Sequence, residues 1–232
     1  MTDQITHCQH CHEDFQCVRR VPIFSDLSEK QINEVMNLIE PITLEKGEYL
    51  YQAGDITSSL YVVDEGRIRI TRISESGKQQ LIRILKSGEF TGELALFQET
   101  IHDSYAEALE KTEICMIKQA DFTALLEKYP RIAVKVLAEF ALRLKVAEKQ
   151  ATAVAIESVE TRLAQYLIEI SDLNQTKDSL KLPMSKKDLA SYLGTTPETL
   201  SRKLTTFEDE GIIKQAGQRI IMITDYEKLL IK

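Results

Sequence analysis

The stretch LPMSKKDLASYLGTTPETLSRKLTTFEDEGIIK, residues 182–214, decides the C-terminal fold. Ser185, followed three residues later by Asp188, is a capping signature for the start of a helix. Apolar residues at helical spacing follow, and Gly194 is a typical residue to end that helix. The stretch therefore begins with a short helix that has one inward, apolar face.

A second helix is predicted directly after the first. Thr196 is a suitable N-cap, and Pro197 fits the first helical position, where the missing N–H does no harm. Gly211 is expected to stop this helix. Three apolar residues fall on its inward face: Leu200, Leu204 and Phe207. Two helices joined by a tight glycine-containing turn form the unit that places its second helix in the DNA major groove.

The opposite face of the second helix carries polar side chains: Glu198, Thr199, Ser201, Arg202 and Thr205. An arginine can donate two hydrogen bonds to guanine and a glutamate can accept one from cytosine, so this face suits base recognition. The alternative is an exposed salt bridge between Glu198 and Arg202, which lie four residues apart. The capped first helix, the glycine turn and the proline at the helix start favour DNA binding.

The tail IIKQAGQRIIMITD, residues 212–225, predicts two strands around Ala216-Gly217-Gln218, which would form a wing beside the helices. Lys203, Lys214 and Arg219 are candidates for phosphate contacts, which fix the position of a protein on DNA without reading its sequence.

The region from Gly47 to Gly92 has a different texture. It contains six of the nine glycines, which separate short runs such as LYVV, RIRITRI and QLIRIL. Many short strands with turn signals predict an all-β barrel or roll. Before it, SDLSEKQINEVMNLI (residues 25–39) predicts a short amphipathic helix capped by Ser25 or Ser28.

A long helix is predicted after Pro130, because no further glycine or proline occurs until beyond Leu173. An apolar seam at alternating steps of four and three favours pairing with a second copy in a dimer, and Ala147 and Ala151 would allow close approach. The alternative is a helix packed on its own domain. The seam comprises Ala133, Leu137, Phe140, Leu144, Ala147, Ala151, Val154 and Ser158.

Four segments follow from these patterns: a cysteine-rich arm (1–20), a β-roll (21–129), a dimerisation helix (130–156) and a winged helix-turn-helix domain (157–232). The fold class is α+β. The net charge is −7, with 18 Lys and Arg against 24 Asp and Glu up to Ile156 and 11 against 12 after it, so a nucleic-acid surface is more plausible in the C-terminal part. The chain has no secretory signal or long apolar run, so we expect a cytoplasmic protein without a membrane partner.

The stretch HCQHCHEDFQC, residues 7–17, holds three of the four cysteines, Cys8, Cys11 and Cys17, and Cys115 is expected just after the β-roll. Cys115 is as suitable for a core as for a metal site. The arm cysteines with His7, His10 and His12 would also suit zinc, and a thiol–disulfide switch is a further possibility. A zinc-buffering protein is therefore an alternative of another class, whereas no nucleophile motif or phosphate loop supports an enzyme.

In order, the β-roll, long helix and winged helix-turn-helix resemble the CRP/FNR family of bacterial transcription regulators over nearly the whole chain. The resemblance rests on KGEYLYQAGDITSSLYVVDEGRIRI (46–70), SVETRLAQYLIEI (158–170) and TPETLSRKL (196–204). Glu198, Ser201 and Arg202 are similar to the FNR branch, which implies TTGAT-type half-sites in an inverted repeat. Pro197 stands where the cyclic-AMP branch has an arginine, so that branch's consensus site is disfavoured.

FTGELALFQETIHDSYAEA, residues 90–108, resembles the phosphate-binding cassette of cyclic-nucleotide domains, with Gly92 and Glu93 in place. The family's phosphate-clamping Arg-Ser pair falls on Asp103 and Ser104. A carboxylate repels a phosphate, so we expect no cyclic-nucleotide binding by the usual mode.

The FNR-type oxygen sensors are similar in all four cysteines. The resemblance implies a four-iron four-sulfur cluster on Cys8, Cys11, Cys17 and Cys115, in a homodimer that binds double-stranded DNA and RNA polymerase. Ala147 is uncharged where FNR-type seams carry an acidic residue, so we expect oxygen to change DNA affinity more than it changes oligomeric state.

Overall fold

The computed structural model describes residues 16–232 except 58, 76, 78, 97–99 and 175–178. They form two compact units: unit 1 runs to Ile73 and then from Ile82 to Arg143, and unit 2 holds Ser74–Leu81 and Leu144–Lys232.

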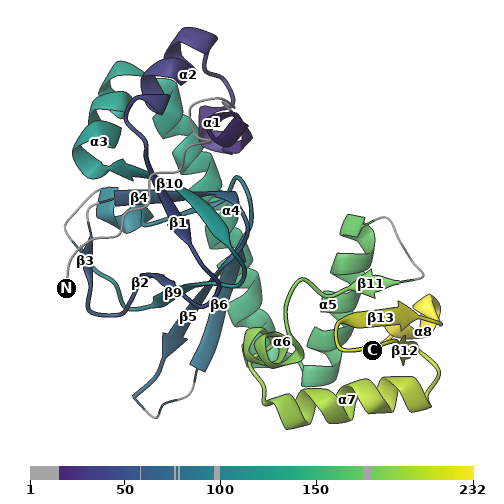
Figure 1. Cartoon of the computed structure of the whole chain (residues 1–232). Helices are drawn as coiled ribbons and strands as arrows, with labels where there is room; N and C mark the ends of the chain where they lie inside the picture. The colour runs from purple at the N-terminus through teal and green to yellow at the C-terminus, as the bar shows by residue number, and fades with distance from the viewer. Residues whose placement is uncertain (1–15, 58, 76, 78, 97–99, 175–178) are drawn as a thin grey trace. The chain divides into compact units, whose positions relative to one another are not determined.

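Unit 1 is a β-roll carrying short helices (Figure 1). One sheet has the strand order β1-β10-β4-β7, another has the order β2-β9-β5-β6, and β3 pairs with β8. The predicted β-roll is therefore confirmed, and it has the form of a double-stranded β-helix, or jelly roll. The strands are β1 (Glu40–Leu44), β2 (Tyr49–Tyr51), β3 (Ile56–Thr57), β4 (Ser59–Glu65), β5 (Ile68–Ile73), β6 (Gln79–Leu85), β7 (Phe90–Thr91), β8 (Thr100–Ile101), β9 (Tyr105–Ala108) and β10 (Thr112–Lys118).

Among the described residues of unit 1, two hydrophobic clusters hold the fold together. One lies inside the roll and includes Ile68 and Ile114. The other joins the roll to its helices and includes Phe24, Phe90 and Phe122. The helices of unit 1 are α1 (Gln16–Arg20), η1 (Pro22–Phe24), α2 (Glu29–Met36), η2 (Glu93–Leu96) and α3 (Gln119–Lys128). The cap predicted for α2 is Ser28, within a capping box.

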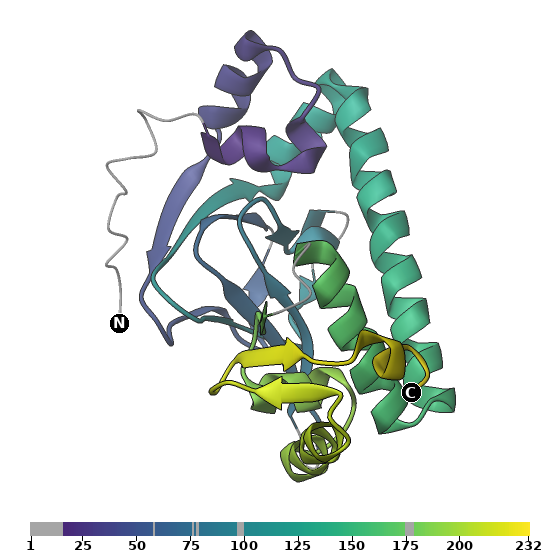
Figure 2. The same cartoon turned by 90° about the vertical axis from the view of Figure 1, so that its right-hand side faces the viewer.

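The long helix is confirmed as α4 (Pro130–Ile156), which Figure 2 shows without a break. Its first turns bury Ile132 and Val136 against unit 1. Leu137 and Leu144 of the predicted seam are 65% and 61% exposed, so these positions are available to another surface. Phe140 corrects the seam, because it lies one turn after Val136 and packs against the core of unit 1.

Unit 2 contains the winged helix-turn-helix fold. Its sheet has the order β11-β13-β12, and the two wing strands pair Ile213 with Ile223 and Lys214 with Met222. The wing is confirmed, and β11 is a third strand that the sequence patterns did not predict. The elements are α5 (Val159–Asn174), β11 (Leu180–Lys181), α6 (Lys186–Tyr192), α7 (Pro197–Asp209), β12 (Ile213–Gln215), β13 (Ile220–Ile223) and α8 (Tyr226–Leu230).

Candidate nucleic-acid interface and cysteine site

The turn between α6 and α7 is built as the sequence predicts. The Ser185 hydroxyl caps α6 by accepting a hydrogen bond from the Asp188 N–H at 3.1 Å. Gly194 follows α6 with φ of +66°, a conformation in which a side chain is disfavoured. The Thr195 N–H donates to the Ala190 carbonyl at 2.9 Å and closes the end of the helix. The direction of the chain entering α7 is thereby fixed.

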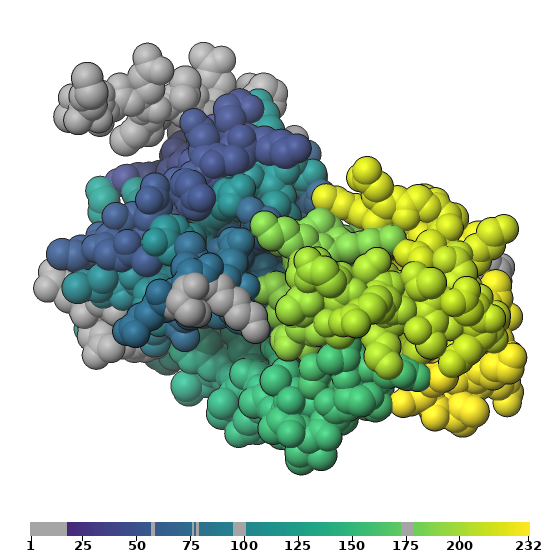
Figure 3. Space-filling model, turned by 90° about the horizontal axis from the view of Figure 1, so that it is seen from below, coloured from purple at the N-terminus to yellow at the C-terminus, as the bar shows by residue number. Residues whose placement is uncertain are grey.

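The helix α7 has one apolar face and one polar face. Thr196 caps it by accepting from the Thr199 N–H at 3.2 Å, and Pro197 occupies the first turn. The three apolar side chains on the inward face are at most 1% exposed: Leu200, Leu204 and Phe207. Their burial places the polar face outward. In Figure 3 the yellow-green surface belongs to this helix-turn-helix segment.

Glu198, Ser201 and Arg202 are all exposed on that outward face, and Thr199 is half-buried. An Arg202 Nη2 lies 3.4 Å from the Thr199 hydroxyl. Among the ion pairs of the described residues, none joins Glu198 to Arg202, so the salt-bridge alternative is not formed. The pKa of Glu198 is lowered by its own backbone N–H and by the Thr196 hydroxyl, with the positive charge of Arg202 adding to the effect. The carboxylate is therefore ionised at neutral pH and acts purely as an acceptor.

Lys203 differs from the other predicted DNA-binding residues. Its Nζ lies 2.7 Å from an Oε2 of Glu160 on α5, and its side chain is 35% exposed. Lys214 and Arg219, by contrast, are exposed on the wing. Lys203 thus shares α7 with Glu198, Thr199, Ser201 and Arg202, but its side chain is turned toward α5.

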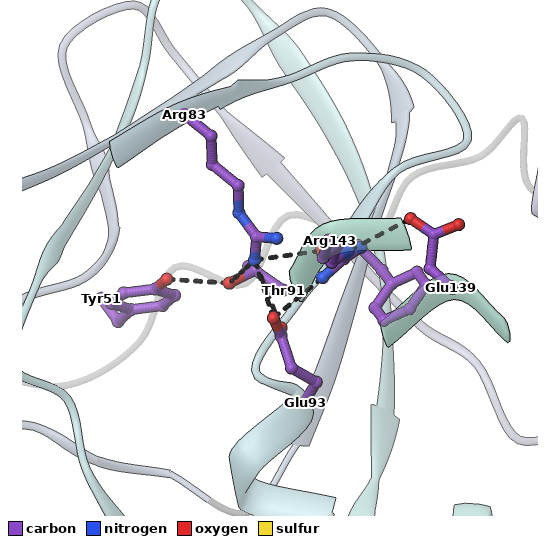
Figure 4. A network of polar contacts seen from close by, with 7 residues as sticks. Tyr51, Arg83, Thr91, Glu93, Glu139 and Arg143 are labelled. Carbon is purple, nitrogen blue, oxygen red and sulfur yellow. Dashed lines mark hydrogen bonds and ion pairs between the residues drawn. The ribbon is translucent and has the colours of Figure 1, made fainter. Parts of the chain in front are cut away.

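Within unit 1, a network of charged side chains joins the roll to α4 (Figure 4). Glu93 accepts hydrogen bonds from Arg83 at 3.0 Å and from Arg143 of α4 at 2.8 Å. Arg143 also pairs with Glu139 at 3.1 Å and lies 4.1 Å above the ring of Phe90. Sequence reasoning missed this network, because only the fold brings strand, loop and helix together.

The predicted phosphate-clamp positions also lie in the roll. Asp103 forms an ion pair with Arg72, and both side chains are largely exposed. Nearby, the Tyr51 hydroxyl and the Thr91 hydroxyl are 2.9 Å apart, and the ring of His102 stacks on Tyr51 at 3.5 Å. The carboxylate at position 103 is thus already satisfied by a guanidinium of the same chain.

The cysteines are described in part. Cys8 and Cys11, with His7, His10 and His12, lie outside the described residues, and Cys17 belongs to α1, although its side chain is not described. Within the described ranges, no group of three or more His, Cys, Asp or Glu side chains is placed to hold a metal ion.

Cys115 corrects one expectation. It does not follow the roll but lies within strand β10, paired with Pro41 on one side and Val62 on the other, because its neighbours Ile114 and Ile117 continue the strand pattern. It is 2% exposed and belongs to the same hydrophobic cluster as Val18 of α1. The helix carrying Cys17 therefore packs on the core that contains Cys115.

Together, a β-roll, a long helix with exposed apolar positions and a winged helix-turn-helix with an outward polar face define a DNA-binding transcription regulator. In the described part of the chain, no helix is both long and apolar enough to cross a membrane.

Comparisons with known proteins agree with this class. Residues 41–129 match the model of the Cyclic nucleotide-binding domain, and residues 161–230 match the Crp-like helix-turn-helix domain. The chain is 33% identical over 204 residues to the "Probable transcriptional regulator flp" of Lacticaseibacillus casei, covering 88% of this chain and 92% of the relative. It is 29% identical over 229 residues to the "Anaerobic regulatory protein" of Haemophilus influenzae, covering 97% and 86%. The solved structure of FixK2 from Bradyrhizobium japonicum matches with a TM-score of 0.71 and 25% identity, covering 83% of this chain and 96% of that one.

The chain belongs to the CRP/FNR family of transcription regulators. This is a family of DNA-binding regulators and not of enzymes.

Proposed function

We propose that this protein is a dimeric, sequence-specific transcription regulator of the cytoplasm that reads a TTGAT-like inverted repeat and responds to oxygen or redox state. The observation that carries the DNA-reading part is the outward face of α7. Glu198, Ser201 and Arg202 are exposed on this face, and the opposite, apolar face of the helix is fully buried.

Each reading residue has a chemical role in this proposal. Arg202 donates two hydrogen bonds to the O6 and N7 of a guanine, and Glu198 accepts from the N4 amino group of a cytosine. Ser201 and Thr199 are short hydroxyl side chains that suit the remaining base edges. Lys214 and Arg219 contact phosphates from the wing and position the domain without reading bases.

The dimer in this proposal forms along α4. Leu137 and Leu144 are each more than 60% exposed, and they lie two turns apart on the same helix. Apolar side chains that repeat in this way are typical of helices that pair. A twofold dimer would present two copies of α7 to an inverted repeat, with RNA polymerase as a further partner.

The sensing part rests on the cysteines. We propose that Cys8, Cys11, Cys17 and Cys115 hold a four-iron four-sulfur cluster, which four thiolates suit and which supplies the sensitivity to oxygen. The helix α1 packs on the hydrophobic core that contains Cys115, which supports this proposal. Relatives named anaerobic regulatory proteins support it as well.

A thiol–disulfide switch is the second candidate, and zinc bound by the same thiols is a further one. The observation that favours the switch is that α1, the helix that carries Cys17, packs on the same hydrophobic cluster of residues as Cys115, so a second thiol belongs to a neighbouring segment. Both candidates use the same cysteines, but the protein would contain iron and sulfide in the first case and would lack them in the second.

Protein prepared without oxygen and analysed for iron, sulfide and zinc separates these candidates. If the iron–sulfur cluster is present, we expect iron and sulfide in equal amounts and a brown colour that bleaches in air. Colourless protein with zinc, or with neither metal, would contradict the cluster. A Cys115→Ser variant should lose the iron in the first case, and it should lose the effect of oxidants on DNA binding in the second.

Operator binding is tested separately with a duplex that carries a TTGAT inverted repeat. The native protein should bind it roughly a thousandfold tighter than a scrambled duplex at physiological salt. Equal affinity for the two duplexes would remove sequence-specific reading.

We also propose that the roll takes no cyclic nucleotide by the usual mode. Asp103 pairs with Arg72, and Glu93 pairs with both Arg83 and Arg143, so these guanidinium groups have carboxylate partners within the chain. Micromolar binding of cyclic AMP in a calorimeter would contradict this.

A further inference from the structure

The first turn of α5 contacts α7, the proposed reading helix, on the side away from its outward polar face. Glu160 lies in this turn, and its carboxylate accepts from Lys203 of α7 at 2.7 Å and from Lys232 at 2.9 Å. The side chains of Glu160 and Lys232 are each 23% exposed, so the pairs are shielded from solvent on most sides. Partly buried pairs are weakened less by salt than exposed ones.

Lys232 extends this contact along α7. Its Nζ also lies 2.6 Å from a carboxylate oxygen of Glu210, the residue that caps the end of α7. Its backbone oxygen accepts from the Thr161 hydroxyl at 2.9 Å. The helix α7 is therefore tied to the first turn of α5 at Lys203 and again, through Lys232, at its C-terminal end.

The same turn of α5 also holds the end of the long helix. The Nη1 of Arg162 donates to the carbonyl oxygens of Ala153 at 3.3 Å, Val154 at 3.2 Å and Glu157 at 2.8 Å. Ala153 and Val154 belong to the last turn of α4, and Glu157 follows directly after it. The Ala153 carbonyl also accepts from the Glu157 N–H at 2.9 Å, so Arg162 adds a side-chain donor to the end of this helix. Arg162 is 9% exposed, so this contact is buried.

We propose that the first turn of α5, residues 160–162, is the joint that fixes the reading helix relative to the end of α4, and that Lys203 is a positioning residue and not a phosphate contact. This inference rests on the proposed reading of DNA by α7. Lys203 would have to leave Glu160 to reach a phosphate, and Glu160 would then lose one of its two cationic partners.

The charge state of the joint agrees with its geometry. Hydrogen bonds from Lys203 and then from Lys232 lower the pKa of Glu160, so this carboxylate is ionised at neutral pH. Glu160 also lies in the first turn of a helix, where the helix dipole favours a negative charge.

The substitution Glu160→Gln should change operator affinity in different directions for the two roles of Lys203. If Lys203 contacts a phosphate, removing the acid frees the lysine and leaves operator binding unchanged or tighter. If Lys203 positions α7, the substitution should weaken binding to the inverted repeat about tenfold while non-specific binding changes little, because specific binding needs exact register. Glu169→Gln is the matched control, since Glu169 is an exposed acid on the same helix.

The dependence of affinity on salt gives a second measure. Lys214→Met, on the wing, should reduce the steepness of the fall of log K with log salt by about 1, where K is the association constant for the operator. Lys203→Met should weaken operator binding without changing this slope. Lys203→Arg keeps the positive charge and should bind the operator as the native protein does. Tighter binding by Glu160→Gln, or a slope for Lys203→Met reduced as in Lys214→Met, would overturn the inference.

Hydrogen exchange tests the joint without any DNA. The amides of α7 should exchange faster in Glu160→Gln than in Glu169→Gln, with both proteins folded at the temperature used. If the native protein fails to select the inverted repeat but α7 loosens as expected, the proposed reading of DNA fails and the joint stands. Unchanged exchange in α7 would count against the joint itself.

Discussion

Arg202 is the side chain on which the proposed base selection by α7 depends most. Its guanidinium is exposed, and its nearest side-chain partner within the chain is the Thr199 hydroxyl at 3.4 Å. We predict that Arg202→Ala weakens operator binding about 5- to 150-fold, equivalent to roughly 1 to 3 kcal/mol for a lost bidentate contact. Fluorescence anisotropy with the native repeat and with a repeat altered at the guanine measures this.

Arg219→Ala is the control for Arg202→Ala. As a wing residue proposed to contact phosphate, Arg219 should affect all duplexes alike. Preserved discrimination at the guanine in Arg202→Ala would remove that side chain from base reading.

We predict that His102 makes the stability of unit 1 depend on pH. Burial lowers the pKa of His102 below 6.5, and the opposing effect of Asp55, Asp103 and Glu93 is smaller. The unfolded chain therefore binds the proton at a higher pH than the folded chain does. The contribution of the neutral ring to stability is complete above pH 6.5 and is lost as the pH falls through the folded value.

Urea unfolding at a series of pH values between 8 and 5 checks this prediction. His102→Phe keeps a ring to stack on Tyr51 but removes the titrating group, so the loss of stability below pH 6.5 should be smaller in the variant. Parallel curves for the two proteins would show that His102 does not contribute.

At the level of elements, the entry to η2 depends on a close backbone approach at Gly92. This residue has φ of +82°, and a Cβ there would lie 2.3 Å from the Ser59 carbonyl oxygen of β4. We predict that Gly92→Ala lowers the free energy of unfolding by about 3 kcal/mol or more, because strain and a backbone clash add. Urea denaturation measures this loss.

Gly54→Ala is the matched control. Gly54 has φ of +100° but no atom within 4 Å of the position of a Cβ. Its variant should lose about 1 to 2 kcal/mol, which is the strain without the clash. Equal losses for the two variants would mean that the strand and the loop separate easily at Gly92.

For the whole molecule, the exposed apolar side of α4 is the proposed dimer contact. Leu137→Glu would place a charge in that contact, and we predict that sedimentation then shows monomers at concentrations where the native protein is dimeric. Ile156→Glu is the control, since Ile156 is 79% exposed at the helix end and outside the seam.

Exposure of the native protein to air should leave its sedimentation unchanged and alter its DNA affinity. An air-induced monomer would contradict the persistent dimer.

Much of the fold was predictable because its signals are local. Ser185, Thr196 and Gly194 act within a few residues of their own position, so caps and turn were predicted where the structure has them. The strands of the wing were found for the same reason. The strand β11 was missed because two residues, Leu180 and Lys181, are too short a run to show alternation.

The remaining features depend on contacts between segments far apart in the chain. Cys115 was expected after the roll, but pairing with both Pro41 and Val62 places it inside a sheet. Glu93 meets Arg143 across fifty residues, and Lys203 meets Glu160 across forty-three. A side chain on a helix face reads the same in sequence whether it points to DNA or to a carboxylate of its own domain.

The burial of the Cys115 sulfur within β10 also sets a time scale. A thiol at 2% exposure between two neighbouring strands reacts with small alkylating reagents only while the covering segments are open. The labelling rate of this sulfur therefore measures how often the roll opens locally. A regulator that takes its signal through this atom can respond to a dissolved oxidant no faster than that opening allows.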